Sequence, residues 1–166
     1  RLIYMNRHEK DALFTRLIRQ NKSRIYMMCQ AYCDDNDAVD DCFQEVAIKI
    51  WNGLDTFKNQ SSIETWIYRV ILNACITFRR DSKRVPSTES VLIDVADSND
   101  TEREDHIEKL YSLIRQLNRY DRALVLLWLE NLSYAEIADI MGLTVNNVSV
   151  KLVRIKEKLK SLSKNI

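Results

Sequence analysis

The chain has 166 residues, of which 46% are hydrophobic and 30% are charged, and its net charge is +1. Two glycines and one proline are too few for the turns that many short strands require, so we expect an all-α protein. No apolar run reaches the ~18 residues of a membrane span, so we expect no membrane insertion and a cytoplasmic location.

The first part of the chain has the apolar pattern of three helices. Apolar residues recur at helical spacing between Leu13 and Tyr32, and the polar run 34–37 interrupts them. A second helix is predicted from about Ala38 to Trp51, and a third from about Ile63 to Arg80, with a loop over residues 53–62 between them. We expect these helices to form one unit over residues 10–84.

Four cysteines fall in this first unit: Cys29, Cys33, Cys42 and Cys75. Cys29 and Cys33 are one helical turn apart, a spacing that two metal ligands can use. A zinc site needs further ligands, and neither His8 nor His106 stands at a suitable spacing. We therefore expect the cysteines to be small buried apolar residues, with no metal or cofactor.

Residues 85–105 have the composition of a flexible acidic linker. They contain the single proline, several serines and few apolar side chains. From Ser87 to Leu110 the chain has eight acids against only two basic residues. A second helical unit is expected over residues 106–164. Its predicted helices are Ile107–Leu117, Asp121–Glu130, Tyr134–Met141 and Val145–Leu162.

The last two of these helices have the signals of a helix-turn-helix. Ser133 and Glu136 form a capping box at the start of the shorter helix. Gly142 stands where that helix must end, because glycine tolerates the left-handed conformation of such a stop. Thr144 is a suitable N-cap for the long helix that follows, so the sequence predicts two helices joined by a tight turn.

The long helix has the composition of a DNA-reading element. Six basic residues and one acid occur between Leu143 and Ile166. Asn146, Asn147 and Ser149, near its start, can meet base edges in the major groove, whereas later lysines and arginines suit phosphates. These residues alone leave both a free-standing regulator and a promoter-reading subunit of RNA polymerase possible.

The sequence of the first unit distinguishes these two possibilities. Val39–Trp51, which reads VDDCFQEVAIKIW, resembles the polymerase-binding helix of the sigma-70 family of RNA polymerase sigma factors. Phe57–Arg69, which reads FKNQSSIETWIYR, resembles the family segment that follows it, and Leu132–Leu159 resembles the domain that reads the -35 element. Two such domains and a linker are typical of the extracytoplasmic-function group of this family.

The resemblance implies a role for each unit. Residues 10–84 would be sigma region 2 and residues 106–164 sigma region 4, with core RNA polymerase (its β′ and β subunits), promoter DNA and an anti-sigma factor as partners. The implied polymerase-binding residues are Asp40, Asp41, Gln44, Glu45 and Lys49. The implied -10 DNA-binding residues are Lys58, Asn59, Ser61, Ser62, Trp66, Arg69, Asn73, Arg79 and Arg80. The implied -35 DNA-binding residues are Ser133, Thr144, Asn146, Asn147, Ser149, Val150, Lys151, Val153, Arg154 and Lys158.

The chain also departs from the family pattern. Asn59 stands where glycine is common, and Asn146 and Asn147 replace a common Gly-Thr pair. The promoter sequence therefore does not carry over from relatives. Because no nucleophile–base pair, phosphate loop or metal set occurs, we expect a sigma factor that is not an enzyme. The alternatives are a free-standing helix-turn-helix regulator and a sigma-like module that sequesters another protein.

Overall fold

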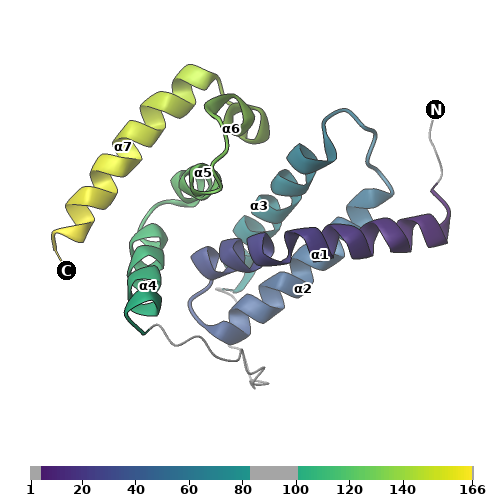
Figure 1. The fold of residues 1–166 in the computed structure, drawn as a ribbon, viewed down its shortest axis with the longest axis horizontal. Coiled ribbons are helices and arrows are strands. Elements are labelled where there is room, and N and C mark those ends of the chain that lie inside the picture. The colour runs from purple at the N-terminus through teal and green to yellow at the C-terminus, as the bar shows by residue number, and fades with distance from the viewer. Residues whose placement is uncertain (1–4, 83–100, 166) are drawn as a thin grey trace. The chain divides into compact units, whose positions relative to one another are not determined.

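The computed structural model describes residues 5–82 and 101–165, with the side chains of residues 79–82 outside that description. It has two compact units, Arg1–Pro86 and Ser87–Ile166. The described residues form seven helices and no strand, which confirms the all-α prediction (Figure 1). Most of the predicted linker lies outside the described residues.

The N-terminal unit is a bundle of three helices, α1 (Arg7–Tyr32), α2 (Asn36–Leu54) and α3 (Ile63–Ser82), each packed on the other two. Asn6 and Glu9 form a capping box at the start of α1. The Asp35 side chain accepts the Ala38 amide at 2.8 Å and caps α2. The centre of the bundle is apolar because each helix turns its hydrophobic face inward. That core includes Ile25, Met28, Val46, Ile50, Ile67 and Ile71.

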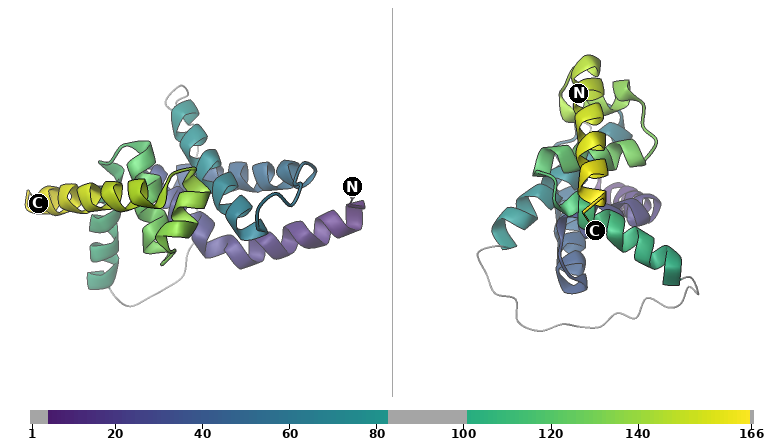
Figure 2. Two further views of the ribbon diagram at one scale, coloured as in Figure 1. Left: turned by 90° about the horizontal axis from the view of Figure 1, so that it is seen from above. Right: turned by 90° about the vertical axis from the view of Figure 1, so that its left-hand side faces the viewer.

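The C-terminal unit has four helices, α4 (Thr101–Arg115), α5 (Arg119–Leu129), α6 (Tyr134–Met141) and α7 (Val145–Ser163). The short α5 is the central element and packs on the other three. Five consecutive residues of α5, from Ala123 to Leu127, are at most 1% exposed, so this helix is covered on several faces. Two further views show α7, in yellow, as a single straight rod (Figure 2).

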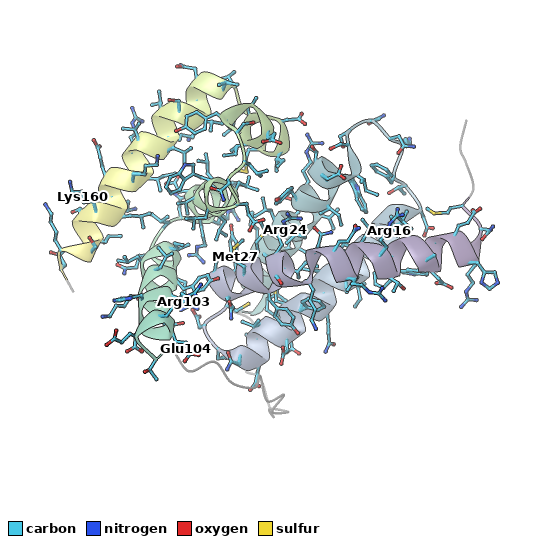
Figure 3. The ribbon with its side chains drawn as sticks, viewed as in Figure 1. Arg16, Arg24, Met27, Arg103, Glu104 and Lys160 are labelled. Atoms are coloured by element: carbon cyan, nitrogen blue, oxygen red, sulfur yellow. The ribbon has the colours of Figure 1, made fainter. Side chains whose placement is uncertain are left out.

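Helix α4 begins at Thr101 rather than near Ile107 as predicted. Residues 101–106 are exposed and have no apolar side chain, so these turns show no apolar pattern that would predict a helix. Glu102 and Glu104 lie in the first turn, where acidic side chains stabilise the helix dipole. Figure 3 shows Arg103 and Glu104 on these first turns. An acidic segment is typical of a linker, but acidic side chains also favour the start of a helix, as they do here.

Within the described residues, no helix combines the length and the apolar character needed to cross a bilayer.

Candidate functional site

The outer face of α2 carries an acidic and amide-bearing surface. Asp41 and Gln44 are exposed, and Asp40 and Glu45 beside them are half-buried. The opposite face of the helix is buried through Val39, Cys42, Val46 and Ile50. Because this packing fixes the rotation of α2, the surface points to solvent in a fixed orientation. We call Asp40, Asp41, Gln44, Glu45, Ile48 and Lys49 the α2 surface.

Two members of the α2 surface add to the predicted picture. Lys49 Nζ lies 3.8 Å from a Glu45 carboxylate oxygen, so this lysine partly neutralises the acid one turn before it. Ile48 is 53% exposed, although its side chain is apolar. It follows Asp41 and Gln44 on the same helical stripe. Ile48 is not among the residues predicted from the sequence, although its seven-residue spacing from Asp41 places it on the same face of the helix.

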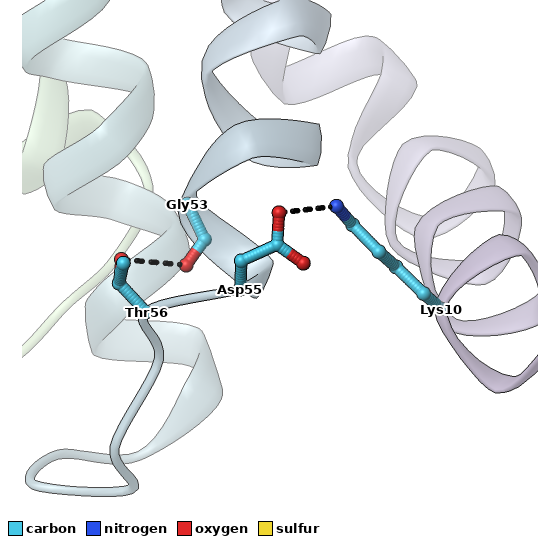
Figure 4. Close-up of polar contacts among 4 residues, drawn as sticks. All are labelled: Lys10, Gly53, Asp55 and Thr56. Carbon is cyan, nitrogen blue, oxygen red and sulfur yellow. Dashed lines mark hydrogen bonds and ion pairs between the residues drawn. The ribbon is translucent and has the colours of Figure 1, made fainter. Parts of the chain in front are cut away.

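The loop after α2 is held at its start by contacts with α1. Lys10 Nζ lies 2.7 Å from an Asp55 carboxylate oxygen, and the Thr56 hydroxyl donates to the Gly53 carbonyl at 3.1 Å (Figure 4). The same ammonium group lies 4.0 Å from the ring centre of Trp51. Lys10 is only 8% exposed, so this contact is a built part of the bundle rather than a surface pair.

The polar loop itself presents most of its predicted residues to solvent. Lys58, Asn59 and Ser62 are exposed, and Ser61 is half-buried. Asn59 has a φ of +53°, in the left-handed region that favours glycine. Asparagine is among the non-glycine residues that enter this region most readily. Asn59 therefore suits the backbone conformation that the loop adopts here.

Trp66 connects this loop to the bundle. It is half-buried, and its ring centre lies 5.1 Å from that of Phe57 in a tilted arrangement. A Cβ atom added to Gly53 would lie 2.8 Å from Trp66 Cζ2, so this glycine leaves the space that the indole needs. Arg69, half-buried, and Asn73, exposed, follow Trp66 along the same side of α3. Arg79 and Arg80 lie further along α3, with their side chains outside the described set.

The helix-turn-helix forms as the sequence predicts. The Ser133 hydroxyl accepts the Glu136 amide at 3.2 Å, and the Glu136 carboxylate accepts the Ser133 amide at 2.7 Å. This hydrogen bond holds the pKa of Glu136 below its ordinary value. Gly142 ends α6 with a φ of +66°, and Thr144 caps α7 by accepting the Asn147 amide at 3.1 Å. The capping box, the glycine stop and the threonine cap are therefore confirmed.

The outer face of α7 is polar at its start and basic further along. Val148, Leu152 and Ile155 are buried against the unit, which fixes this face toward solvent. Lys160, further along the helix, extends outward in Figure 3. The predicted contact residues that lie exposed are Asn146, Asn147, Val150, Lys151, Val153, Arg154 and Lys158, while Ser149 is half-buried.

Two apolar side chains stand out on this face of α7. Val150 is 42% exposed and Val153 is 53% exposed, so neither contributes fully to the core. Apolar side chains at such positions can contact thymine methyl groups in the major groove. Lys156 is different, since its ammonium group lies 4.2 Å from the Trp128 ring centre. It packs on the unit rather than joining the outer face.

Three of the hydroxyl groups predicted to bind DNA accept backbone hydrogen bonds at the starts of helices. Ser62 accepts the Thr65 amide at 3.1 Å near the start of α3, and Ser133 and Thr144 cap α6 and α7. These side chains therefore stabilise helix N-termini. The free amides and positive dipole end of an N-terminus favour a negatively charged group.

Both units match known families. The model described as "Sigma-70 region 2" matches residues 17–85, and that described as "Sigma-70, region 4" matches residues 107–159. RNA polymerase sigma factor SigZ of Bacillus subtilis is 32% identical over 135 residues, which cover 78% of this chain and 74% of the relative. RNA polymerase sigma factor SigV of the same organism is 27% identical over 146 residues, covering 86% of both chains.

Solved structures show the same fold. A structure of CnrH in complex with the cytosolic domain of CnrY matches with a TM-score of 0.69 and 19% identity, covering 93% of this chain and 90% of that one. The sigma factor RpoE of Bartonella quintana, in complex with the anti-sigma factor NepR, matches with a TM-score of 0.65 and 21% identity, covering 91% and 96%. At these identities the likeness concerns the fold.

Proposed function

The chain belongs to the extracytoplasmic-function group of the sigma-70 family of transcription initiation factors, and we propose that its two units divide promoter recognition between them. The match of both regions in one chain separates it from a free-standing helix-turn-helix regulator. The main observation behind the proposal is the α2 surface. Binding DNA alone does not require an acidic surface beside a polar loop, whereas binding a basic surface of the polymerase does.

We propose that the α2 surface docks core RNA polymerase, on a basic surface of the β′ subunit. Exposed Asp41 supplies charge complementarity, and exposed Gln44 supplies directed hydrogen bonds. Ile48, 53% exposed on the same stripe, adds the apolar contact that fully polar faces lack. Asp40 and Glu45 flank this centre, and Lys49, paired with Glu45, lies at its rim. The β subunit would complete the interface elsewhere on the chain.

The loop 58–62 and the exposed side of α3 are proposed to take the melted -10 strand. Lys58, Asn59, Ser61 and Ser62 provide polar groups for an unstacked base and its phosphates. Trp66 positions this loop through Phe57 and stays half-buried, so we assign it a positioning role beside any direct contact. The same strand would continue along Arg69, Asn73, Arg79 and Arg80.

We propose that α7 reads the duplex -35 element. Asn146, Asn147, Ser149 and the exposed valines Val150 and Val153 face base edges. Lys151, Arg154 and Lys158 bind phosphates, since they are exposed further along the same helix. The capped N-termini at Ser133 and Thr144 hold the backbone amides that also attract phosphate.

The remaining parts of the proposal concern partners and setting. The acidic segment before α4 avoids DNA and suits a basic channel of the polymerase. An anti-sigma factor is a proposed partner, supported by the structural neighbour that was solved with the anti-sigma factor NepR. The chain would act in the cytoplasm and without catalytic chemistry of its own.

The docking surface is tested by the affinity of the full chain for purified core polymerase. We expect Asp41→Ala with Gln44→Ala, and separately Ile48→Ala, to weaken binding, the double variant by roughly 30-fold or more, equivalent to ~2 kcal/mol. The matched control is Asp11→Ala with Gln20→Ala, which removes the same two residue types from exposed positions of α1. Wild-type affinity in the double α2 variant would contradict the proposal.

A further inference from the structure

The core of the N-terminal unit brings three cysteines together from three different helices. Cys29 lies on α1, Cys42 on α2 and Cys75 on α3, and none of them is exposed. Cys75 Sγ lies 3.8 Å from Cys42 Sγ and 4.0 Å from Cys29 Sγ. All three sulfur atoms lie within 4.8 Å of one another. Residues far apart in the sequence thus meet at one point.

Cys33, the fourth cysteine, lies at the edge of this cluster. It is the C-cap residue of α1, is 4% exposed, and its Sγ donates to the Ala38 carbonyl at 3.5 Å. It stands one helical turn after Cys29, to whose carbonyl its backbone N–H donates, and it is buried like the other three cysteines. All four cysteines of the chain therefore gather in one part of one unit.

The sulfur separations match the geometry of a thiolate metal site. Sulfur atoms bound to one ion at about 2.3 Å stand roughly 3.8–4.0 Å apart, whether three surround it in a plane or four in a tetrahedron. Two of the three separations already have this length. A small adjustment of side chains, within helices that keep their places, completes the third.

The chemistry of sulfur agrees with this geometry. A cysteine binds a metal ion after its thiol has lost its proton. The thiolate is the form that binds metals, and an isolated negative charge in an apolar core is costly. A cation among the three sulfur atoms compensates that charge and replaces the S–H protons.

We propose that Cys29, Cys42 and Cys75 form a binding site for one thiophilic d10 metal ion, Zn²⁺ or Cu⁺. Soft sulfur ligands select these ions over hard cations. Three thiolates suffice for Cu⁺, whereas Zn²⁺ takes four ligands and recruits Cys33 as the fourth. The bound ion ties the three helices of the unit together. Because Cys42 lies between Asp41 and Gln44 in the sequence, the site also fixes the helix that carries the α2 surface.

The test uses the full chain, reduced and freed of metal without oxygen. Titration with Co²⁺, a spectroscopic substitute for Zn²⁺, should give a thiolate-to-metal charge-transfer band that saturates at one ion per chain. Zn²⁺ and Cu⁺ arms should each raise Tm at equimolar ion. A folded wild-type chain with neither the Co²⁺ band nor a rise in Tm with Zn²⁺ or Cu⁺ would overturn the proposal.

Variants identify the ligands. Cys75→Ser, or Cys75→Ala if the serine variant is unfolded by circular dichroism, should lose the charge-transfer band and the rise in Tm. Cys33→Ser should weaken Zn²⁺ binding and keep that of Cu⁺. The control is Met28→Leu, a change at a fully buried position of α1 beside Cys29. This variant should keep the charge-transfer band and the rise in Tm. A folded Cys75 variant that binds metal as the wild type does would also overturn the proposal.

Discussion

Gly53→Ala should destabilise the N-terminal unit because of one side chain, Trp66. Gly53 lies in α2, where replacing glycine by alanine at a compatible position stabilises a protein by about 0.4–1 kcal/mol. Here the new Cβ would lie 2.8 Å from Trp66 Cζ2, well inside ordinary contact. Forcing an indole to shift in a packed site costs about 1–3 kcal/mol. The net loss expected in the free energy of unfolding is therefore ~1 kcal/mol.

The same structure predicts that the sign of this effect depends on Trp66. The nearest atoms, Trp66 Cζ2 and Cη2, belong to the six-membered ring of the indole. In a Trp66→Phe background that reach is shortened, so Gly53→Ala should become neutral or stabilising. Urea unfolding of the four proteins gives the coupling energy, expected at roughly 1 kcal/mol or more. Equal effects of Gly53→Ala in both backgrounds would refute the steric explanation.

Further predictions concern the C-terminal unit. Gly142→Ala should lower the stability of this unit by about 1–2 kcal/mol, and Gly142→Asn by less. A Cβ atom at Gly142 would meet no neighbour, so the cost comes from the φ of +66°, which alanine tolerates poorly. Equal denaturation midpoints for the alanine variant and the wild type would contradict this. Ser133→Ala should cost ~1 kcal/mol in urea unfolding through loss of the α6 cap, and an unchanged midpoint counts against it. The pKa of Glu136 is lower in the folded state than in the unfolded state. Its contribution to stability is therefore fully present above the unfolded-state pKa and is lost as pH falls through the folded-state pKa. Glu136→Gln should accordingly make stability depend less on pH in the acidic range. Arg154→Ala should reduce the slope of log affinity for duplex DNA against log salt concentration by roughly 0.9. Lys156 packs on Trp128, so Lys156→Ala should leave this slope unchanged. The opposite result for the two variants would refute the assignment of the outer face of α7.

The helices and caps of this chain are predictable because their signals are local. Ser133, Glu136, Gly142 and Thr144 act within one or two turns of their own positions, and the structure places each as the sequence predicts. Asn59 belongs to the same class, since a left-handed residue is a property of its own backbone. Amphipathic spacing likewise determines which face of α2 and α7 is buried.

Other features depend on contacts between distant residues. The Lys10–Asp55 pair joins α1 to the loop after α2, and the sulfur cluster needs the relative rotation of three helices. Sequence spacing shows only Cys29 and Cys33 as neighbours, whereas the structure also places Cys29 beside Cys42 and Cys75. The early start of α4 was missed for a different reason, because its first turns pack on no core that would impose an apolar pattern.

Run-off transcription with purified core polymerase tests most directly whether the two units have separate roles, with polymerase binding at α2 and -35 duplex binding at α7. The full chain should direct core enzyme to defined start sites on duplex templates. Asp41→Ala with Gln44→Ala should abolish those transcripts and leave binding to isolated -35 duplex unchanged, whereas Arg154→Ala should weaken both. Start-site-specific transcripts at wild-type level from the Asp41→Ala, Gln44→Ala protein would contradict the account.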